Sequence, residues 1–327
     1  MYKILQSHSL LFFWSPSALS RIVSRFFATS STMNLETKAL AAFDRLVQSG
    51  ELLWKETAPR HVPSSPFNFE FRVAASLAKK PRTAHQKKVV NAFADDNPDF
   101  SLGLIGPNHK LILNKFCVVR PQFVLHTVEF VPQQRALDSA DLGSLWHVLQ
   151  SLQSEHIAIF NCGVDAGASV GHKHMQILPH PGGSDFQFFP DTVPAQDGKA
   201  LIPYEASTTD LPTRFHIGIY SVPNIPFQHA VQWLPNEINE NILASIYHDL
   251  LSHLTLGQES AHNLILVKDW IMVIPRRTGW IGDLGANAAA MIGMVWMTSE
   301  QDYEGWTKQD PMLLLPTFGV PVEASSS

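Results

Sequence analysis

Cysteine is almost absent from this sequence. Its 327 residues include only Cys117 and Cys162, which lie far apart, and no C-x-x-C pair occurs. Two distant cysteines in apolar surroundings do not make a disulfide framework, and the ligand spacing of a cysteine-type zinc site is missing. The sequence therefore predicts a protein of a reducing compartment without a structural zinc.

Long apolar runs and basic stretches are also missing. The apolar run from Leu10 to Trp14 is too short to cross a bilayer, so we expect no membrane anchor. A net charge of −5 without a basic stripe argues against a nucleic-acid partner. The loop from Gly282 to Gly285 lacks the G-x-G-x-x-G spacing of a dinucleotide fold. At 45% hydrophobic residues, the chain is long enough for one large domain or two closely packed halves.

Acidic residues are absent from the first 32 residues, which carry Lys3, Arg21 and Arg25. This segment is rich in serine, and on a helix over residues 17–27 the apolar side chains lie opposite the two arginines. Such a pattern is typical of a mitochondrial transit peptide. Met33 follows directly, so the alternative is a dispensable extension. We predict a cytoplasmic protein with mitochondrial targeting by residues 1–32.

The most informative segment runs from Asn161 to Gln176 and has the sequence NCGVDAGASVGHKHMQ. Its glycines allow positive φ and close approach to a ligand, and successive N–H groups of such a loop form an anion-binding concavity. A strand follows in which side chains alternate between faces. His172, His174 and Gln176 share one face, whereas Lys173, Met175 and Ile177 share the other.

A histidine beside a phosphate cradle can attack phosphorus, because a neutral imidazole nitrogen is available near pH 7. Two alternating histidines are also compatible with a metal pair or with a structural role. Of the 15 histidines in the chain, those outside this strand are scattered, and we expect most of them on the surface. The combination of glycine loop, paired histidines and glutamine favours transfer of a phosphoryl-containing group.

This segment resembles the signature of the histidine-triad superfamily, and specifically its fungal-type ATP adenylyltransferases, the diadenosine tetraphosphate (Ap4A) phosphorylases. Three other stretches are similar to strands of that family: Phe71–Pro81, His109–Val119 and Asn263–Arg276. The resemblance implies an α+β fold with a histidine-triad-like antiparallel sheet and flanking helices. It also implies a catalytic portion over residues 33–205 and a C-terminal portion over residues 206–327, packed on the same core.

The resemblance makes His174 the nucleophile. It attacks the α-phosphorus of Ap4A, expels ATP and forms an adenylyl-histidine, from which inorganic phosphate releases ADP. Hydrolase branches carry a third histidine at the position of Gln176, and a glutamine there can only hydrogen-bond, which favours transfer to phosphate over hydrolysis. His172 orients the nucleophile or donates to a phosphate oxygen, with a structural role as the alternative.

The resemblance also predicts substrate contacts in the glycine loop, at two lysines that neutralise a polyphosphate chain, at two asparagines that contact the ribose or a phosphate, and at one C-terminal asparagine near the nucleotide. These predicted contacts are Lys80, Asn114, Lys115, Asn161, Gly163, Gly167, Ala168, Ser169 and Asn287. Mg²⁺ is expected as an ion bound to the substrate's phosphates, without a tightly bound metal. The expected partners are Ap4A, phosphate, ATP and ADP, and the expected assembly is a monomer or homodimer.

The chain also departs from the family pattern. Gln122 stands where a histidine is usual, and Thr298 stands where a lysine is usual. These changes affect positions near the phosphates and keep open a non-catalytic nucleotide-binding regulator. A histidine-triad hydrolase is disfavoured by Gln176, and a hexose-1-phosphate uridylyltransferase is disfavoured by Lys173, where that enzyme typically has proline.

Periodicity predicts alternating helices and strands. The predicted helices are Leu35–Leu53, Asp138–Leu152 and Asn236–Leu254. The predicted strands are Phe67–Ala75, Leu111–Val119, Phe123–Phe130, Phe215–Tyr220, His229–Leu234 and Trp270–Ile274. The Arg120-Pro121 turn between the second and third strands predicts an antiparallel hairpin.

Overall fold

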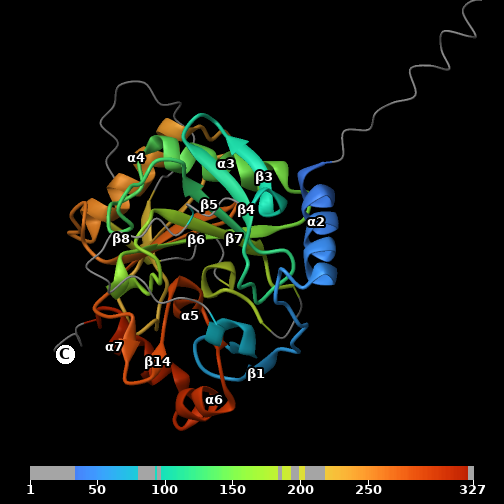
Figure 1. The fold of residues 1–327 in the computed structure, drawn as a ribbon. Coiled ribbons are helices and arrows are strands. Elements are labelled where there is room, and N and C mark those ends of the chain that lie inside the picture. Colours follow the sequence, from blue (N-terminus) through green and yellow to red (C-terminus); the bar gives the residue numbers. More distant parts are fainter. Residues whose placement is uncertain are drawn as a thin grey trace, which may run out of the picture. The chain divides into compact units, whose positions relative to one another are not determined.

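The structure is a computed structural model that describes residues 34–79, 93, 97–182, 186–192, 199–202 and 218–322 (Figure 1). The predicted leader, residues 1–32, lies outside the described residues, as does Lys80. No helix within the described part of the chain has both the length and the apolar character that crossing a membrane requires.

One antiparallel sheet of ten described strands forms the centre of the fold, in the order β3-β4-β5-β7-β6-β11-β12-β10-β9-β8. These strands are β3 (Ser101–Ile105), β4 (His109–Leu113), β5 (Phe123–Thr127), β6 (His156–Cys162), β7 (His174–Pro179), β8 (Lys199–Ile202), β9 (Ile219–Ser221), β10 (Ala230–Trp233), β11 (His262–Leu266) and β12 (Trp270–Pro275). Strands β6 and β11 are neighbours, with Asn161 opposite Asn263. Both halves of the chain therefore build one sheet.

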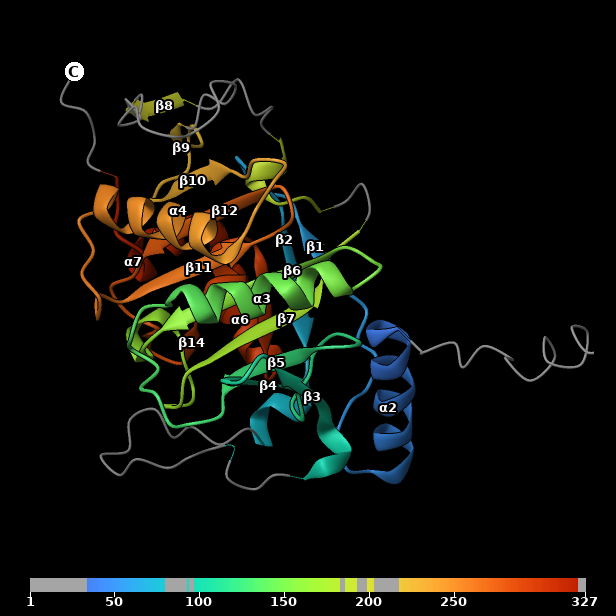
Figure 2. The same ribbon diagram turned by 90° about the horizontal axis from the view of Figure 1, so that it is seen from above.

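Side chains alternate along the central strands, so the sheet has two buried faces. In β6, Ala158 and Phe160 pack with one apolar cluster, whereas Ile157 and Ile159 pack with the other. The first face is covered by helices α2 (Leu35–Ser49), α3 (Ser139–Ser151) and α4 (Glu240–His253). Figure 2 shows α3 and α4 lying across this face.

The second face is covered mainly by C-terminal segments, which lie below the sheet in Figure 1. They comprise α5 (Ala288–Met291), α6 (Glu300–Thr307), α7 (Leu315–Phe318), the hairpin of β13 (Trp280–Ile281) and β14 (Leu284–Gly285), and β15 (Met294–Met297). Strand β15 runs parallel to β2 (Phe69–Val73), which pairs with β1 (Arg60–Val62). N-terminal and C-terminal segments therefore also pair in a second, three-stranded sheet.

Capping residues explain the ends of the helices. Asn34 caps α2 by accepting from the Thr37 N–H, and Gly50 ends it in the left-handed conformation at φ 79°. The predicted helix over residues 35–53 is therefore too long by its last turn. Asp138 caps α3 through a capping box with Asp141, which confirms the helix predicted there.

The structure confirms the α+β fold and the antiparallel hairpin, with shorter strands than predicted. β4 ends at Leu113 because the Asn114 side chain accepts the Phe116 N–H and turns the chain. β2 gives way after Val73 to a short 3₁₀ helix, residues 75–79. Helix α4 and strands β10 and β12 occupy their predicted positions, while the predicted strand at 215–220 lies partly outside the described residues. The other 3₁₀ turns are Pro98–Phe100, Val164–Ala166, Phe189–Thr192 and Pro311–Leu313.

The expectation that most scattered histidines lie on the surface does not hold among the described residues, where five of the ten histidines outside the motif are buried. The buried histidine side chains outside the motif are His109, His126, His156, His229 and His262. Burial lowers the pKa of His229 and of His262 to about 4, so both rings are neutral at physiological pH. A neutral imidazole that hydrogen-bonds to the backbone is tolerated in a core, which composition alone does not reveal.

Candidate active site

A cavity of about 730 Å³ lies between the second face of the sheet and the C-terminal segments. The alternation predicted for the motif strand is confirmed over residues 174–177, because His174 and Gln176 line this cavity whereas Met175 and Ile177 pack on the opposite face. A cavity of this size accommodates a ligand larger than a single nucleotide base. Its lining also includes the exposed residues Asp283, Glu304 and Lys308.

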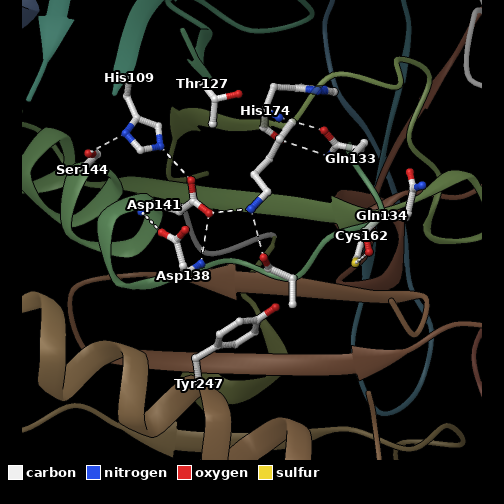
Figure 3. Close-up of polar contacts among 12 residues, drawn as sticks. His109, Thr127, Gln133, Gln134, Asp138, Asp141, Ser144, Cys162, His174 and Tyr247 are labelled. Carbon is white, nitrogen blue, oxygen red and sulfur yellow. Dashed lines mark hydrogen bonds and ion pairs between the residues drawn. The ribbon is translucent and has the colours of Figure 1, made fainter. Parts of the chain in front are cut away.

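His174 begins β7 and presents one defined ring nitrogen to the chemistry. Its Nδ1 lies 2.8 Å from the carbonyl oxygen of His172, which accepts only, so Nδ1 carries the proton and Nε2 carries the lone pair. Gln133 holds the main chain of His174: its Oε1 accepts the His174 N–H at 2.7 Å, and its Nε2 donates to the His174 and Asn161 carbonyls (Figure 3). The bond at Nδ1 therefore fixes the ring, and the bonds of Gln133 fix the main chain that carries it.

The glycine loop is clamped against the C-terminal half. Gly167 has φ +91°, and a Cβ there would lie 2.5 Å from the Ala286 carbonyl oxygen. A Cβ at Gly279 would lie 2.5 Å from the Val164 carbonyl oxygen. Only glycine fits at these two contacts. The close approach brings the loop and Asn287 to the same side of the cavity.

Six carboxamides line the cavity, and in those of Asn114, Asn161, Gln176 and Asn287 the carbonyl oxygen accepts a protein N–H. The Asn114 oxygen accepts from Phe116, the Asn161 oxygen from Ala288 and Asn263, the Gln176 oxygen from Gln122, and the Asn287 oxygen from Ala290. What these side chains have left to offer a ligand is therefore the NH₂ group. A set of donors suits an acceptor-only ligand such as a phosphate chain.

A buried arginine holds the loop in place. Arg276 donates to the carbonyls of Ala166 and Ala286 and to the Asn263 side chain. Burial lowers the pKa of Arg276 to about 9, which leaves it charged at physiological pH. Asn263 also donates to Asn161 at 2.9 Å, so a charge behind the cavity orders a neutral side chain that faces it.

Behind the motif strand lies a second buried network, drawn in Figure 3. Lys173 donates to Asp141 at 2.7 Å, and the other carboxylate oxygen lies 2.7 Å from Nε2 of His109, whose Nδ1 lies 3.0 Å from the Ser144 hydroxyl. The Ser-His-Asp order resembles a hydrolase triad. However, His109 and Asp141 are each only 2% exposed and neither lines the cavity, so the network is structural.

His172 lies in a different environment from His174. Its Nε2 is 3.0 Å from the Thr127 hydroxyl and 3.2 Å from the Glu129 carbonyl, and the ring is fully buried. Burial lowers the pKa of His172, so the ring is neutral near pH 7. Phe93 stacks on His126 and contacts the rings of His172 and His174 at its edge. What His172 offers the ring of His174 is its main-chain carbonyl.

Two family models match the chain: the Ap4A phosphorylase N-terminal domain at residues 28–193 and the ATP adenylyltransferase C-terminal domain at residues 223–321. Diadenosine 5',5'''-P1,P4-tetraphosphate phosphorylase 2 of Saccharomyces cerevisiae is 31% identical over 284 residues, which is 77% of this chain and 82% of that protein. The chain belongs to the Ap4A phosphorylase family.

Further comparisons agree with membership of the Ap4A phosphorylase family. Protein APA1 of Saccharomyces cerevisiae is 29% identical over 236 residues, covering 66% of this chain and 69% of that protein. The crystal structure of yeast Ap4A phosphorylase Apa2 in complex with Ap4A has a TM-score of 0.71 and 28% identity, over 89% of this chain and 99% of that one. The complex of Apa2 with AMP has a TM-score of 0.71 and 29% identity, over 90% and 99%.

The structure brings together most of the residues predicted from the likeness to Ap4A phosphorylases. Those that line the cavity are Asn114, Asn161, Gly167, Ser169, His174, Gln176 and Asn287. Four others, among the residues that the structure describes, lie outside the lining: Lys115, Gly163, Ala168 and His172. Lys80 lies outside the described residues.

Several residues of the site were missed by the sequence analysis. Arg276 and Asn263 stand at the two ends of a stretch that resembles an Ap4A phosphorylase strand, and that position was the available signal. Gln133 and Asp141 carry no such mark, because their roles arise from contacts with segments far away in the sequence. Among the described residues, no three His, Cys, Asp or Glu side chains gather in a way that would hold a metal ion.

Proposed function

We propose that this chain is an Ap4A phosphorylase, a nucleotidyltransferase that converts Ap4A and inorganic phosphate into ATP and ADP. Family membership and the likeness to a yeast phosphorylase solved with Ap4A and with AMP support the substrate. The observation that carries the proposal is the geometry of His174, whose proton is held on Nδ1 in a cavity lined by carboxamide donors.

The proposed reaction has two steps. In the first, Nε2 of His174 forms a bond to the α-phosphorus of Ap4A, and the bond from this phosphorus to the bridging oxygen breaks to release ATP. The ring then carries AMP on Nε2 and the proton on Nδ1, so it is positively charged. The His172 carbonyl, 2.8 Å from Nδ1, stabilises that charge without removing the proton.

The second step returns the imidazole to its starting state. An oxygen of inorganic phosphate attacks the same phosphorus, the phosphorus–nitrogen bond breaks, and ADP leaves. Gln176 supports this step as a hydrogen-bond donor to a phosphate oxygen, and a carboxamide cannot act as the general base that would activate water. A neutral residue at this position favours phosphate over water as the acceptor.

Mg²⁺ belongs to the proposal as an ion that arrives bound to the polyphosphate. In this proposal the oxygen ligands of the ion are those of the phosphates and water. The ion would neutralise charge that the carboxamides, being uncharged, leave uncompensated. The donors of the cavity would then orient the phosphates rather than offset their charge.

A phosphate-dependence assay tests the function. Purified protein with Ap4A is expected to yield ATP and ADP only when phosphate is present, and products are quantified by ion-exchange chromatography. ATP with AMP instead would indicate hydrolysis, and nucleotide binding without turnover would indicate a regulator. Either outcome would overturn the proposal.

The intermediate is tested with the same substrate in the absence of phosphate. Mass spectrometry of the peptide that contains residues 172–176 is expected to show an added AMP. His174→Ala should remove the adduct and the turnover together. His172→Ala should slow the reaction without abolishing it, because any residue supplies the main-chain carbonyl at this position. Equal and small effects of both substitutions would contradict the assigned roles.

For the compartment, we propose the cytoplasm, with residues 1–32 acting as a mitochondrial leader in chains that begin at Met1. A fluorescent protein fused to residues 1–32 would locate this segment in cells. For the assembly, we propose a monomer or a homodimer, which sedimentation velocity would distinguish. Neither proposal alters the chemistry of the cavity.

A further inference from the structure

The side chain of Gln122 lies between the backbone amide of Val118 and the side chain of Gln176, which lines the cavity. Its Oε1 accepts the Val118 N–H at 2.9 Å, and its Nε2 donates to Oε1 of Gln176 at 2.8 Å. The side chain is 1% exposed, so both bonds are shielded from water. Gln122 also borders the cavity, but both ends of its carboxamide are bonded inside the protein.

These two bonds define the direction of two carboxamides. A backbone N–H can only donate, so the atom of Gln122 that it meets is the oxygen. The other end of Gln122 is then NH₂, which identifies the atom it meets on Gln176 as the oxygen. Gln176 is consequently left with its NH₂ group for the cavity. The Val118 backbone proton thus sets the polarity of a group two hydrogen bonds away.

We propose that Gln122 is a positioning residue that holds Gln176 with its NH₂ group toward the reacting phosphate; this inference rests on the proposed phosphorylase function. Without the Gln122 bond, the carboxamide of Gln176 is able to rotate by half a turn and present its oxygen to a phosphate oxygen. Two acceptors then face each other, and the transition state loses a donor. Because neither carboxamide titrates, the arrangement holds at every physiological pH.

Gln122→Glu tests the proposal with almost no change of shape. When ionised, the new carboxylate accepts from Val118 and also from Gln176, so Gln176 rotates and presents its oxygen to the phosphate. When protonated, the new carboxyl group still has one O–H to donate, which restores the original direction. We expect kcat/KM to fall on the order of 10- to 100-fold at high pH, as for the loss of a hydrogen bond to a charged group. The loss should shrink as the pH falls from about 8 to about 5.5, since burial raises a glutamate pKa.

A second pair of variants separates positioning from general damage. Gln176→Met removes the donor itself, so Gln122→Glu added to Gln176→Met should reduce kcat/KM by less than about twofold more. Melting temperatures of all variants, measured at each pH, show whether a variant is folded. If the two substitutions multiply in their effects, Gln122 acts by some route other than Gln176, and the proposal is overturned.

The readouts also separate this inference from the proposed function. Wild-type protein that makes ATP and ADP from Ap4A and phosphate supports the function, and a Gln122→Glu variant with wild-type kcat/KM at every pH would then refute the positioning role. If the wild-type protein shows no turnover, the same variants are scored by calorimetry with AMP. There the proposal requires weaker binding by Gln122→Glu at high pH that recovers at low pH, and equal AMP affinity across the pH range rejects it.

Discussion

At the scale of single residues, neighbouring groups fix the direction of several neutral carboxamides in the lining of the cavity. Asn161 illustrates how this direction is imposed, because its oxygen accepts from the Ala288 N–H at 2.8 Å and from Asn263 at 2.9 Å. Sequence resemblance identified Asn161 as a candidate contact. It gave no direction for the carboxamide, because both bonding partners lie more than a hundred residues away in the chain.

Asn161→Asp reverses the polarity of this one group. One carboxylate oxygen still accepts from Ala288 and Asn263, while the second brings a negative charge to the cavity where an NH₂ group was. We expect kcat/KM for Ap4A to fall on the order of 10- to 100-fold, because a hydrogen bond to a charged group is replaced by repulsion. Steady-state kinetics with Ap4A measure the effect.

Asn239→Asp is the matched control for this change. Asn239 caps α4 by accepting two backbone N–H groups, and aspartate caps helices equally well. The control should keep its kcat/KM and its melting temperature. An equal loss of activity in both variants would show that the effect at Asn161 does not arise in the cavity.

At the scale of elements, the motif strand is held by the buried contact between Lys173 and Asp141, and the sequence indicates only part of this contact. Alternation correctly placed Lys173 on the face opposite His174, but nothing local indicated that a lysine on that face is only 1% exposed. It is accommodated because α3 brings Asp141 to 2.7 Å from its Nζ. Periodicity was enough to predict the helix and the strand. The ion pair between Lys173 and Asp141 could not be predicted, because it depends on how the helix packs on the strand.

Asp141→Asn should destabilise the protein strongly. It leaves Lys173 buried without its counter-charge, and breaking one partner of a buried pair costs about 3–5 kcal/mol. Urea unfolding followed by circular dichroism measures the loss. Asp44→Ala is the control, because its ion pair with Arg120 has side chains that are 60% and 34% exposed. An exposed pair contributes about 1 kcal/mol or less, so equal losses in the two variants would contradict the role of Asp141.

The pH dependence of this pair follows from the pKa of Asp141. Burial alone would raise it, but the hydrogen bond from His109 and the charge of Lys173 together lower it. A carboxyl whose folded pKa is lowered stabilises the protein above its unfolded pKa, and that contribution is lost as the pH falls through the folded value. The difference in unfolding free energy between wild type and Asp141→Asn should therefore shrink in acid.

At the scale of the whole molecule, the active site is a product of both halves of the chain. His174 and Gln176 come from the N-terminal half, whereas Gly279 and Asn287 come from the C-terminal half. Strands β6 and β11 join the halves in one sheet, and Arg276 bonds across the same seam to Ala166. The sequence predicted that the second half packs on the same core. It did not reveal which strands meet, because strand order depends on long-range contacts.

The seam predicts that the halves do not fold separately. A fragment of residues 34–205 would expose the edge of β6, and a fragment of residues 206–322 would expose the edge of β11, each with a row of unpaired backbone groups beside apolar side chains. Expressed alone, each fragment should lack a cooperative thermal transition by circular dichroism.

Intact protein with a protease site inserted after residue 205 provides the control. Cleaved under native conditions, it should elute from a sizing column at the position of the uncut chain and keep its phosphorolytic activity, because the sheet holds the pieces together. Cooperative unfolding of the 206–322 fragment alone would contradict the shared sheet as the unit of folding.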